Sequence, residues 1–276
     1  MAESEPADLR KANLRLARRV HRLEATTRHL EQIRDTNGRL LERLMTELDA
    51  ERAKSLALLL NILPQPIIDR LNSGEKVIAD RYDEVSVLFS DFVGFTTISS
   101  RMPVAELVVQ LNALFSRFDA LCEDLGVEKI KTIGDAYMAA AGLPGTRPDH
   151  AVAMAEMALG MRDVVREVGE TWQVRIGVHT GPVIAGVIGS RKFVYDLWGD
   201  TVNVASRMES NSTPDRIQVS APVAAAVGKA FSLESRGQVE LKGKGLAEAY
   251  FLERRPSGHR VTSRPRSRPR PGSTQG

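Results

Sequence analysis

Two aspartates lie where the local sequence predicts a strand end and a hairpin turn. Asp91 follows residues 85–90, whose apolar and polar side chains alternate as in a half-buried strand. Asp135 follows Gly134, and this dipeptide suits a tight turn between two strands. Each aspartate alone could simply form a turn. If both converge in one small sheet, they supply the hard oxygen ligands that Mg²⁺ prefers, and two metals held there could activate an attacking oxygen and stabilise a leaving one.

A second set of polar residues could bind phosphate or sugar groups. Asn203 and Arg207 are four residues apart in a short expected helix that Asp200 could cap, so both should project from one face. Lys242 and Lys244, separated by one glycine, form a basic turn of about the size of a phosphate. Such patterns also occur on ordinary solvated surfaces, so neither one decides a function alone.

Residues 85–253 alternate strand and helix patterns that would position these groups. A helix is expected from about Pro103 until Gly126 ends it, and a further strand over Val174–Val178. A second helix, after Pro148, should direct inward Met154, Met157, Met161, Val164 and Val168. The order predicts an α+β fold: a ferredoxin-like βαββαβ core, with an antiparallel sheet and helices on one face.

Residues 1–60 are expected to form an N-terminal coiled-coil helix. Leucines share one seven-residue register over residues 8–60, namely Leu9, Leu16, Leu23, Leu30, Leu44 and Leu58. Apolar residues recur in the companion register, which predicts a parallel two-stranded coiled coil. A single amphipathic helix lying on its own domain is the alternative. Residues 35–38 are poor helix formers and a candidate hinge.

The rest of the chain divides into a connector at 61–84, the main domain at 85–253 and an Arg/Pro-rich tail at 254–276, which should be disordered. The tail has seven arginines and no acidic residue, so the chain's formal net charge of +3 comes from the tail, and the first 253 residues carry −4. No aromatic residue interleaves these arginines to stack on bases, so no specific nucleic-acid partner is expected. Peripheral contact with a membrane through the tail remains an alternative.

Composition narrows the class of protein. The 276 residues are 42% hydrophobic and 26% charged, as in ordinary soluble globular proteins. No apolar run approaches the ~20 residues of a membrane-spanning helix, and the N-terminus lacks the apolar core of a secretory signal. The single cysteine, Cys122, forms no internal disulfide, which agrees with a cytoplasmic location. Because Cys122 stands among Phe118, Leu121 and Leu125, burial is favoured over a reactive-thiol role.

Four extended segments, in this order, resemble the catalytic domain of class III adenylyl cyclases of the bacterial, soluble, homodimeric type. They are Phe89–Thr96, Glu128–Met138, Phe193–Arg207 and Leu241–Gly245, and the resemblance runs from about Val85 to Leu252. It implies a phosphorus–oxygen lyase that converts ATP to 3′,5′-cyclic AMP and pyrophosphate by two-metal-ion catalysis. It also implies a homodimer whose active sites lie at the subunit interface.

The resemblance assigns a role to each matching position. Asp91 and Asp135, with the backbone carbonyl of Phe92, would bind two Mg²⁺ or Mn²⁺ ions per active site; many relatives have isoleucine at the Phe92 position. Asn203 would orient the ribose, and Arg207 would stabilise charge on the α-phosphate.

The remaining assignments concern substrate binding and the division of the site. Lys131 and Asp196 would select the base, and Arg175 and Lys242 would hold the β- and γ-phosphates. One subunit would supply Asp91, Asp135 and Arg175, and its partner the others.

Hydrogen bonding favours adenine as the base. Adenine presents an acceptor at N1 and a donor at its amino group, which complement the Lys131 donor and the Asp196 acceptor. Guanine presents the reverse pattern, and mispaired, desolvated polar groups cost ~1–3 kcal/mol each. A guanylyl cyclase and a nucleotide-binding scaffold without catalysis are the rival interpretations; the metal aspartates and Arg207 argue against the scaffold.

Overall fold

A computed structural model describes residues 5–169, 171–189 and 192–255 of the chain. These residues fall into two compact units, 1–68 and 69–276. Among the described residues, no helix is both long enough and apolar enough to cross a membrane.

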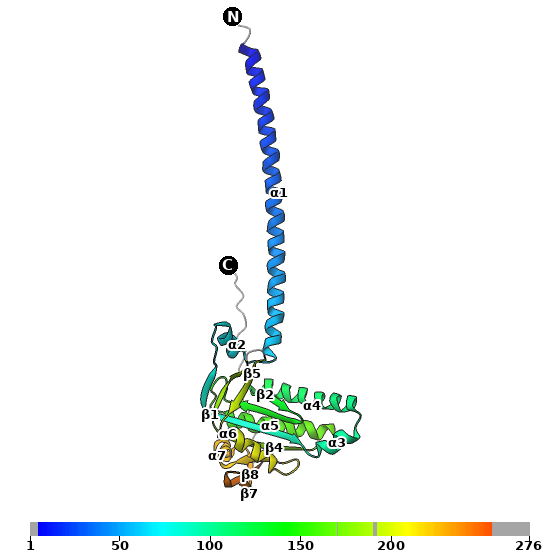
Figure 1. Ribbon diagram of the computed structural model, residues 1–276, viewed down its shortest axis with the longest axis vertical. Helices are drawn as coiled ribbons and strands as arrows, with labels where there is room; N and C mark the ends of the chain where they lie inside the picture. Colours follow the sequence, from blue (N-terminus) through cyan, green and yellow to red (C-terminus); the bar gives the residue numbers. More distant parts are fainter. Residues whose placement is uncertain (1–4, 170, 190–191, 256–276) are drawn as a thin grey trace. The chain divides into compact units, whose positions relative to one another are not determined.

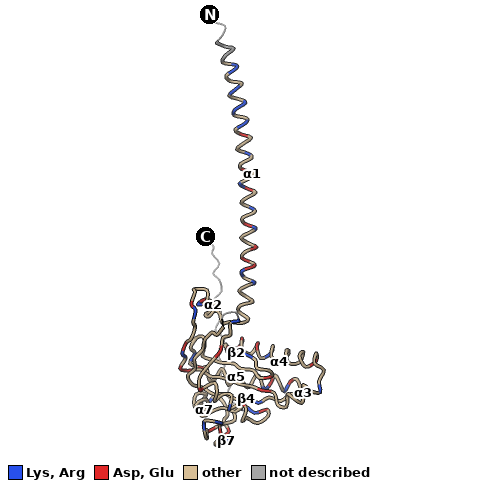
Figure 2. Tube along the Cα trace, in the orientation of Figure 1, with Lys and Arg blue, Asp and Glu red and all other residues tan. Residues whose placement is uncertain are grey.

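The first unit consists mainly of one long helix, α1 (Glu5–Leu60), which continues without a break through residues 35–38 (Figure 1). Basic and acidic residues are both distributed along it (Figure 2). The six leucines of the expected seam are each 51–65% exposed. A stripe of this kind suits a second helix, so the coiled coil stays a prediction. Helix α2 (Gln65–Asn72) follows and runs across the division between the units.

The second unit holds the sheet and its helices. Its strands are β1 (Ala79–Phe92), β2 (Glu128–Ile133), β3 (Ala136–Ala141), β4 (Val174–Ile188), β5 (Val194–Trp198), β6 (Ile217–Ser220), β7 (Ser232–Leu241) and β8 (Gly245–Glu253). Its helices are α3 (Phe95–Arg101), α4 (Val104–Leu125), α5 (His150–Val168), α6 (Asp200–Ser210), α7 (Ala221–Val227) and a short 3₁₀ turn, η1 (Gly228–Ala230).

The strands form one open sheet in the order β2-β3-β1-β4-β6-β8-β7, and β5 pairs separately with β4. The pairs β1–β3, β1–β4 and β2–β3 are antiparallel, whereas β6 joins β4 in parallel. The antiparallel pairing expected of the βαββαβ core thus holds for β1 to β4, and the parallel pair lies where the sheet continues beyond that core. A mixed α/β fold with an open sheet is thereby confirmed.

Helices cover both faces of the whole sheet: α4 and α5, the two long helices of the expected βαββαβ core, lie on one face, and α6, outside that core, lies on the other. Leu88, Ile176 and Val178 pack in the large core with residues of α4 and α5. Side chains alternate between faces along a strand, so Gly177 faces the other way. There α6 crosses so closely that a Cβ on Gly177 would lie 1.9 Å from the Glu209 backbone nitrogen.

The two long helices largely follow their sequence patterns. Gly126, at φ 61°, ends α4, and its N–H bonds to the carbonyls of Cys122 and Glu123. Along α5 the three methionines and Val164 are buried, but Val168 is 44% exposed because the helix ends at this residue. Cys122 is buried as expected, and burial raises the pKa of its thiol to about 11.

The structure bears on two of the expected boundaries, those of the connector and of the tail. Strand β1 begins at Ala79, within the segment 61–84 that we interpreted as a connector, and the four-part division of the chain stays a prediction. Of the tail at 254–276, only Arg254 and Arg255 belong to the described residues, and Arg254 pairs with Asp163. The expectation of disorder concerns residues that lie outside the described part.

Candidate active site

Asp91 and Asp135 meet although they come from distant segments. Asp91 is the second-last residue of β1, and Asp135 lies in the β2–β3 turn beside Gly134, which has φ 65°. The Asp135 carboxyl group lies near the Phe92 backbone and close enough to Asp91 for the charge of that side chain to act on it. Burial, and then the charge of Asp91, raise the pKa of Asp135 to about 6. The negative charges of these two half-buried carboxylates repel each other, and a cation between them would relieve the repulsion.

Aromatic packing fixes the backbone next to Asp91. The Phe92 ring is 3% exposed and meets the Trp172 ring edge-on, with 4.9 Å between centroids. The Val93 N–H also bonds to the Gln173 carbonyl at 2.9 Å. These contacts hold the backbone from which the Asp91 side chain extends.

Arg175 lies between two acidic side chains. Its Cα is the cross-strand partner of Asp91, and its guanidinium donates to Asp91 Oδ2 at 2.8 Å. Its Nε is 3.4 Å from Oε1 of Glu209 on α6. Burial and the nearby aspartates raise the pKa of Glu209 to about 7, while Arg175 opposes the shift. Arg175 thus partly neutralises a cluster of three carboxylates.

The donor set fits a magnesium or manganese ion that is completed by substrate. No group of three or more His, Cys, Asp or Glu side chains in the described ranges is arranged to hold a metal. Mg²⁺ is commonly bound by only one or two carboxylates together with phosphates. Asp91 and Asp135 supply such a pair, and the Arg175 contact indicates that a cation is accommodated beside them.

Lys131 and Asp196 form an ion pair within the chain. Lys131 Nζ on β2 is 2.5 Å from Asp196 Oδ2 on β5, and both side chains are partly buried. The other carboxylate oxygen of Asp196 accepts the Leu197 N–H at 2.8 Å. A donor and an acceptor therefore lie side by side, as reading the edge of a base requires.

Helix α6 presents Asn203 and Arg207 on one exposed face. Within the described ranges, neither side chain makes a hydrogen bond or an ion pair. The expected capping role of Asp200 is wrong. Gly199 occupies the cap position and Asp200 is the first residue of the helix, where its carboxylate pairs with Lys244.

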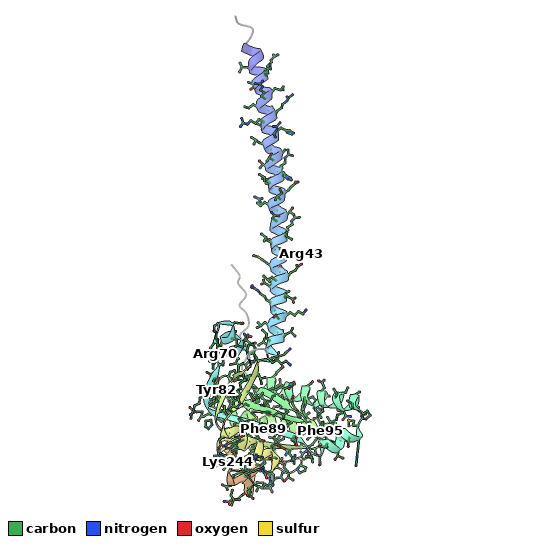
Figure 3. The ribbon with its side chains drawn as sticks, viewed as in Figure 1. Arg43, Arg70, Tyr82, Phe89, Phe95 and Lys244 are labelled. Carbon is green, nitrogen blue, oxygen red and sulfur yellow. The ribbon has the colours of Figure 1, made fainter. Side chains whose placement is uncertain are left out.

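The tip of the β7–β8 hairpin carries Lys242 and Lys244. Lys242 is exposed, whereas Lys244 (labelled in Figure 3) reaches Asp200. Gly243 and Gly245 have φ 78°, which explains why glycines separate the two lysines. The ion pair ties the hairpin tip to the start of α6.

The expected site residues thus fall into three groups. Asp91, Asp135 and Arg175 are brought together, and Lys131 and Asp196 form a pair. Asn203, Arg207 and Lys242 are exposed and make no contact with either group through a described side chain.

Sequence reasoning missed Glu209. Thr201, Ala205 and Met208 on the inner side of α6 are buried, and Glu209, four residues after Ala205, shares their face. An acidic residue in the buried phase of a helix was a signal that could have revealed it, because such a charge needs a partner.

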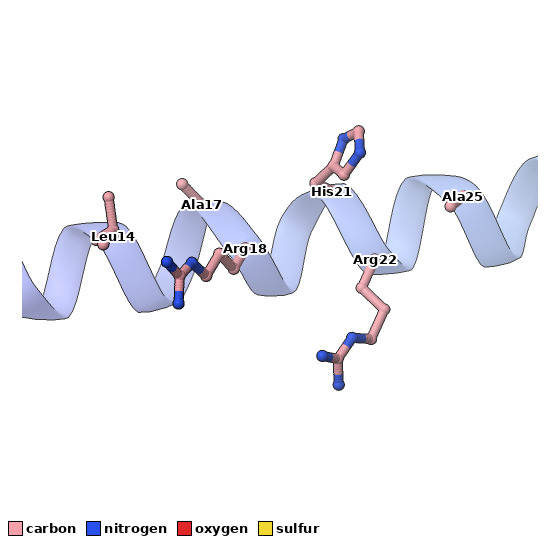
Figure 4. A pocket seen from close by; sticks show the side chains of 6 residues that line it. All are labelled: Leu14, Ala17, Arg18, His21, Arg22 and Ala25. Carbon is pink, nitrogen blue, oxygen red and sulfur yellow. The ribbon is translucent and has the colours of Figure 1, made fainter.

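Two hollows of the described surface lie away from these residues. The one in Figure 4 lies between side chains of α1 and is lined by Leu14, Ala17, Arg18, His21, Arg22 and Ala25. Another is lined by Val20, Leu23, Glu24, Thr27, Arg28 and Glu31, also on α1. Grooves along a single exposed helix are open to solvent and do not enclose a substrate.

Known proteins resemble most of the second unit. Residues 77–254 match the model of the adenylate and guanylate cyclase catalytic domain. An adenylate cyclase of Mycobacterium tuberculosis is 48% identical over 210 residues, which cover 74% of this chain and 47% of the relative. The soluble guanylate cyclase subunit beta-2 of Rattus norvegicus is 42% identical over 215 residues, 76% of this chain and 32% of the relative. The chain thus spans less than half the length of these curated relatives.

Solved structures agree with the fold. The guanylate cyclase domain of RhGC from Catenaria anguillulae, in complex with GTP, is 38% identical with a TM-score of 0.62, covering 64% of this chain and all of that one (100%).

Proposed function

The chain belongs to the family of adenylate and guanylate cyclase catalytic domains, and on that premise we propose that it converts ATP to 3′,5′-cyclic AMP and pyrophosphate. The observation that carries the proposal is the meeting of Asp91, Asp135 and Arg175 at one end of the sheet. Two carboxylates and a guanidinium there suit a metal-bound triphosphate.

The chain's own side chains would bind and orient the substrate. Asp91, Asp135 and the Phe92 carbonyl would hold two Mg²⁺ or Mn²⁺ ions, which lower the pKa of the ribose 3′-hydroxyl and neutralise phosphate charge. Arg175 and Lys242 would bind the β- and γ-phosphates, and Asn203 would orient the ribose. Arg207 would donate to the α-phosphate as charge develops there.

The ion pair of Lys131 and Asp196 supports adenine as the base. The ammonium would donate to N1 and the carboxylate would accept from the amino group, and neither could pair well with guanine. Two relatives bear guanylate cyclase names, however, so a guanylyl cyclase is the second candidate. Incubation with Mn²⁺ and either ATP or GTP separates the two: cyclic AMP as the main product supports the first, and cyclic GMP the second.

A homodimer is part of the proposal. Asn203, Arg207 and Lys242 are exposed, and through described side chains they make no contact with the carboxylates of their own chain. A second copy of the chain would therefore contribute these three residues to the site. The leucine stripe of α1 would promote dimerisation as a coiled coil. Removal of residues 1–55 should therefore raise the concentration at which the dimer dissociates, measured by analytical ultracentrifugation. Unchanged dimerisation would contradict the role of α1.

Two finer features complete the proposal. The core formed by β1, α4, β2, β3, α5 and β4 would be a ferredoxin-like unit, which its element order supports. A cytoplasmic location would give the enzyme access to ATP, and the lone buried cysteine is compatible with it.

A further inference from the structure

Glu209 has no role in the scheme above, yet it occupies an unusual position. The residue is 9% exposed, and its Oε1 lacks a hydrogen-bond partner in the described part of the chain. A carboxylate removed from water in this way requires a compensating charge. Within the described ranges, Arg175 is the only cation in ion-pair contact with it.

The backbone of α6 fixes where this carboxylate lies. Helix α6 crosses β4 directly over Gly177, and a Cβ there would collide with the Glu209 nitrogen. Arg175 and Gly177 are two residues apart and therefore share a face of β4. Glu209 consequently remains beside Arg175 whatever the guanidinium contacts.

Arg175 therefore has two possible anchors at unequal distances. Its guanidinium donates to Asp91 at 2.8 Å, whereas Glu209 lies 3.4 Å from Nε without hydrogen-bond geometry. A divalent ion bound to Asp91 would compete with the guanidinium for the same carboxylate oxygens. Once displaced, Arg175 could turn fully to Glu209 and stay next to the site.

We propose that Glu209 is a positioning residue that receives the Arg175 guanidinium when a divalent cation takes Asp91, and so keeps it beside the triphosphate. This rests on the proposed function, because Asp91 is the assigned metal ligand. By stabilising displaced Arg175, Glu209 makes metal entry easier. Exchange of ion-pair partners is the entire step, and no covalent bond changes.

The test measures Mn²⁺ binding to the nucleotide-free protein, with free Mn²⁺ monitored by electron paramagnetic resonance. Glu209→Gln leaves Asp91 as the only strong anchor for Arg175, so Mn²⁺ should bind about three- to tenfold more weakly. Arg175→Ala removes the competitor, so Mn²⁺ should bind more tightly. In the Arg175→Ala background, Glu209→Gln should change Mn²⁺ affinity by less than about twofold.

Two outcomes would overturn the proposal. An equal loss in both backgrounds would mean that Glu209 acts on the metal directly rather than through Arg175. No loss in the wild-type background would mean that it does not assist metal entry at all. If Glu209→Gln fails to fold, Glu209→Asp takes its place, because it keeps the negative charge on a shorter side chain. Glu209→Asp should cause a smaller loss of Mn²⁺ affinity, and this loss should also disappear in the Arg175→Ala background.

A matched control and a second measurement complete the design. Glu167 also pairs with an arginine, Arg117, but is exposed, and Glu167→Gln should leave Mn²⁺ affinity unchanged. In turnover assays, Glu209→Gln should raise KM for ATP more than it lowers kcat, because Arg175 binds phosphates in ground and transition states alike. Mn²⁺ binding requires no turnover, so an inactive protein with the expected affinities would count against the proposed function alone.

Discussion

The polar side chains at the carboxyl end of β1 and those on the outer face of α6 differ in both burial and pairing. At the end of β1, Asp91 and the nearby Asp135 of the β2–β3 turn are half-buried, and Arg175 pairs with Asp91. On α6, Asn203 and Arg207 are exposed and unpaired within the described part of the chain. The same helix carries Glu209 on its inner face, next to Arg175. One half of the proposed machinery is therefore organised inside the chain, while the other half faces outward.

This difference indicates how a shared site can arise from one sequence. A helix has two sides, and α6 directs one toward its own sheet and the other away from it. In a homodimer with C₂ symmetry, what one chain presents outward the other receives, so two sites would form. The following experiments test whether the two regions act together.

The largest effect should come from removing either half. Asp91→Ala removes a metal ligand and should lower cyclic AMP formation by at least about a thousandfold. Asn203→Ala alone should also lower cyclic AMP formation severely. Mixed and refolded together, they should recover about a quarter of wild-type activity, because half of the dimers are mixed and each has one intact site. If mixing is confirmed by mass spectrometry and no activity returns, the two regions are not shared between chains.

Arg207→Ala should produce the next largest effect. Loss of a donor that acts on developing charge should lower kcat by about 100–1000-fold with little change in KM. Steady-state kinetics with ATP and Mn²⁺ provides the measurement. A rise in KM with unchanged kcat would instead assign Arg207 to ordinary substrate binding.

A smaller effect is expected from the ion pair next to the site. Lys131→Glu removes the donor to adenine N1 and places an acceptor there, which suits the N1–H of guanine. The ratio of kcat/KM for ATP over GTP should fall roughly 10–100-fold. An unchanged ratio would remove Lys131 from base selection; if it came with equal losses for both nucleotides, it would indicate a structural role instead. Lys129→Glu, on the same strand but paired with Asp119, is the control.

The smallest effect concerns a half-buried carboxylate that makes no ion pair with a described side chain. Glu128, at the start of β2, has its pKa raised to about 7 by burial. Between about pH 4.5 and 7 the folded state holds a proton that the unfolded state has lost, so this group lowers stability as pH rises. Glu128→Gln should raise the free energy of unfolding by about 1–3 kcal/mol at pH 8 and have little effect at pH 4, measured by urea denaturation. If Glu128→Gln changed the free energy of unfolding equally at pH 4 and pH 8, the raised pKa of Glu128 would not be the cause of the change.

Local sequence predicted several features correctly. Gly134-Asp135 turns the β2–β3 hairpin because glycine accepts a positive φ there, and Gly126 ends α4 for the same reason. The apolar stripe of α5 follows helical periodicity down to Val164. The start of β1 at Ala79 was missed, because the charged residues Asp80, Arg81 and Asp83 interrupt the apolar pattern expected of a strand. The segment nevertheless pairs with β4.

The sequence by itself determined the local elements, the types of groups available for chemistry and the resemblance that assigns them. Only the tertiary structure decided which groups meet: Asp91 with Asp135, Lys131 with Asp196, and Arg175 with Glu209. Helical and strand periodicities act over a few residues, whereas these pairs are separated by 34 to 65 positions and depend on strand register and on which face of the sheet α6 covers.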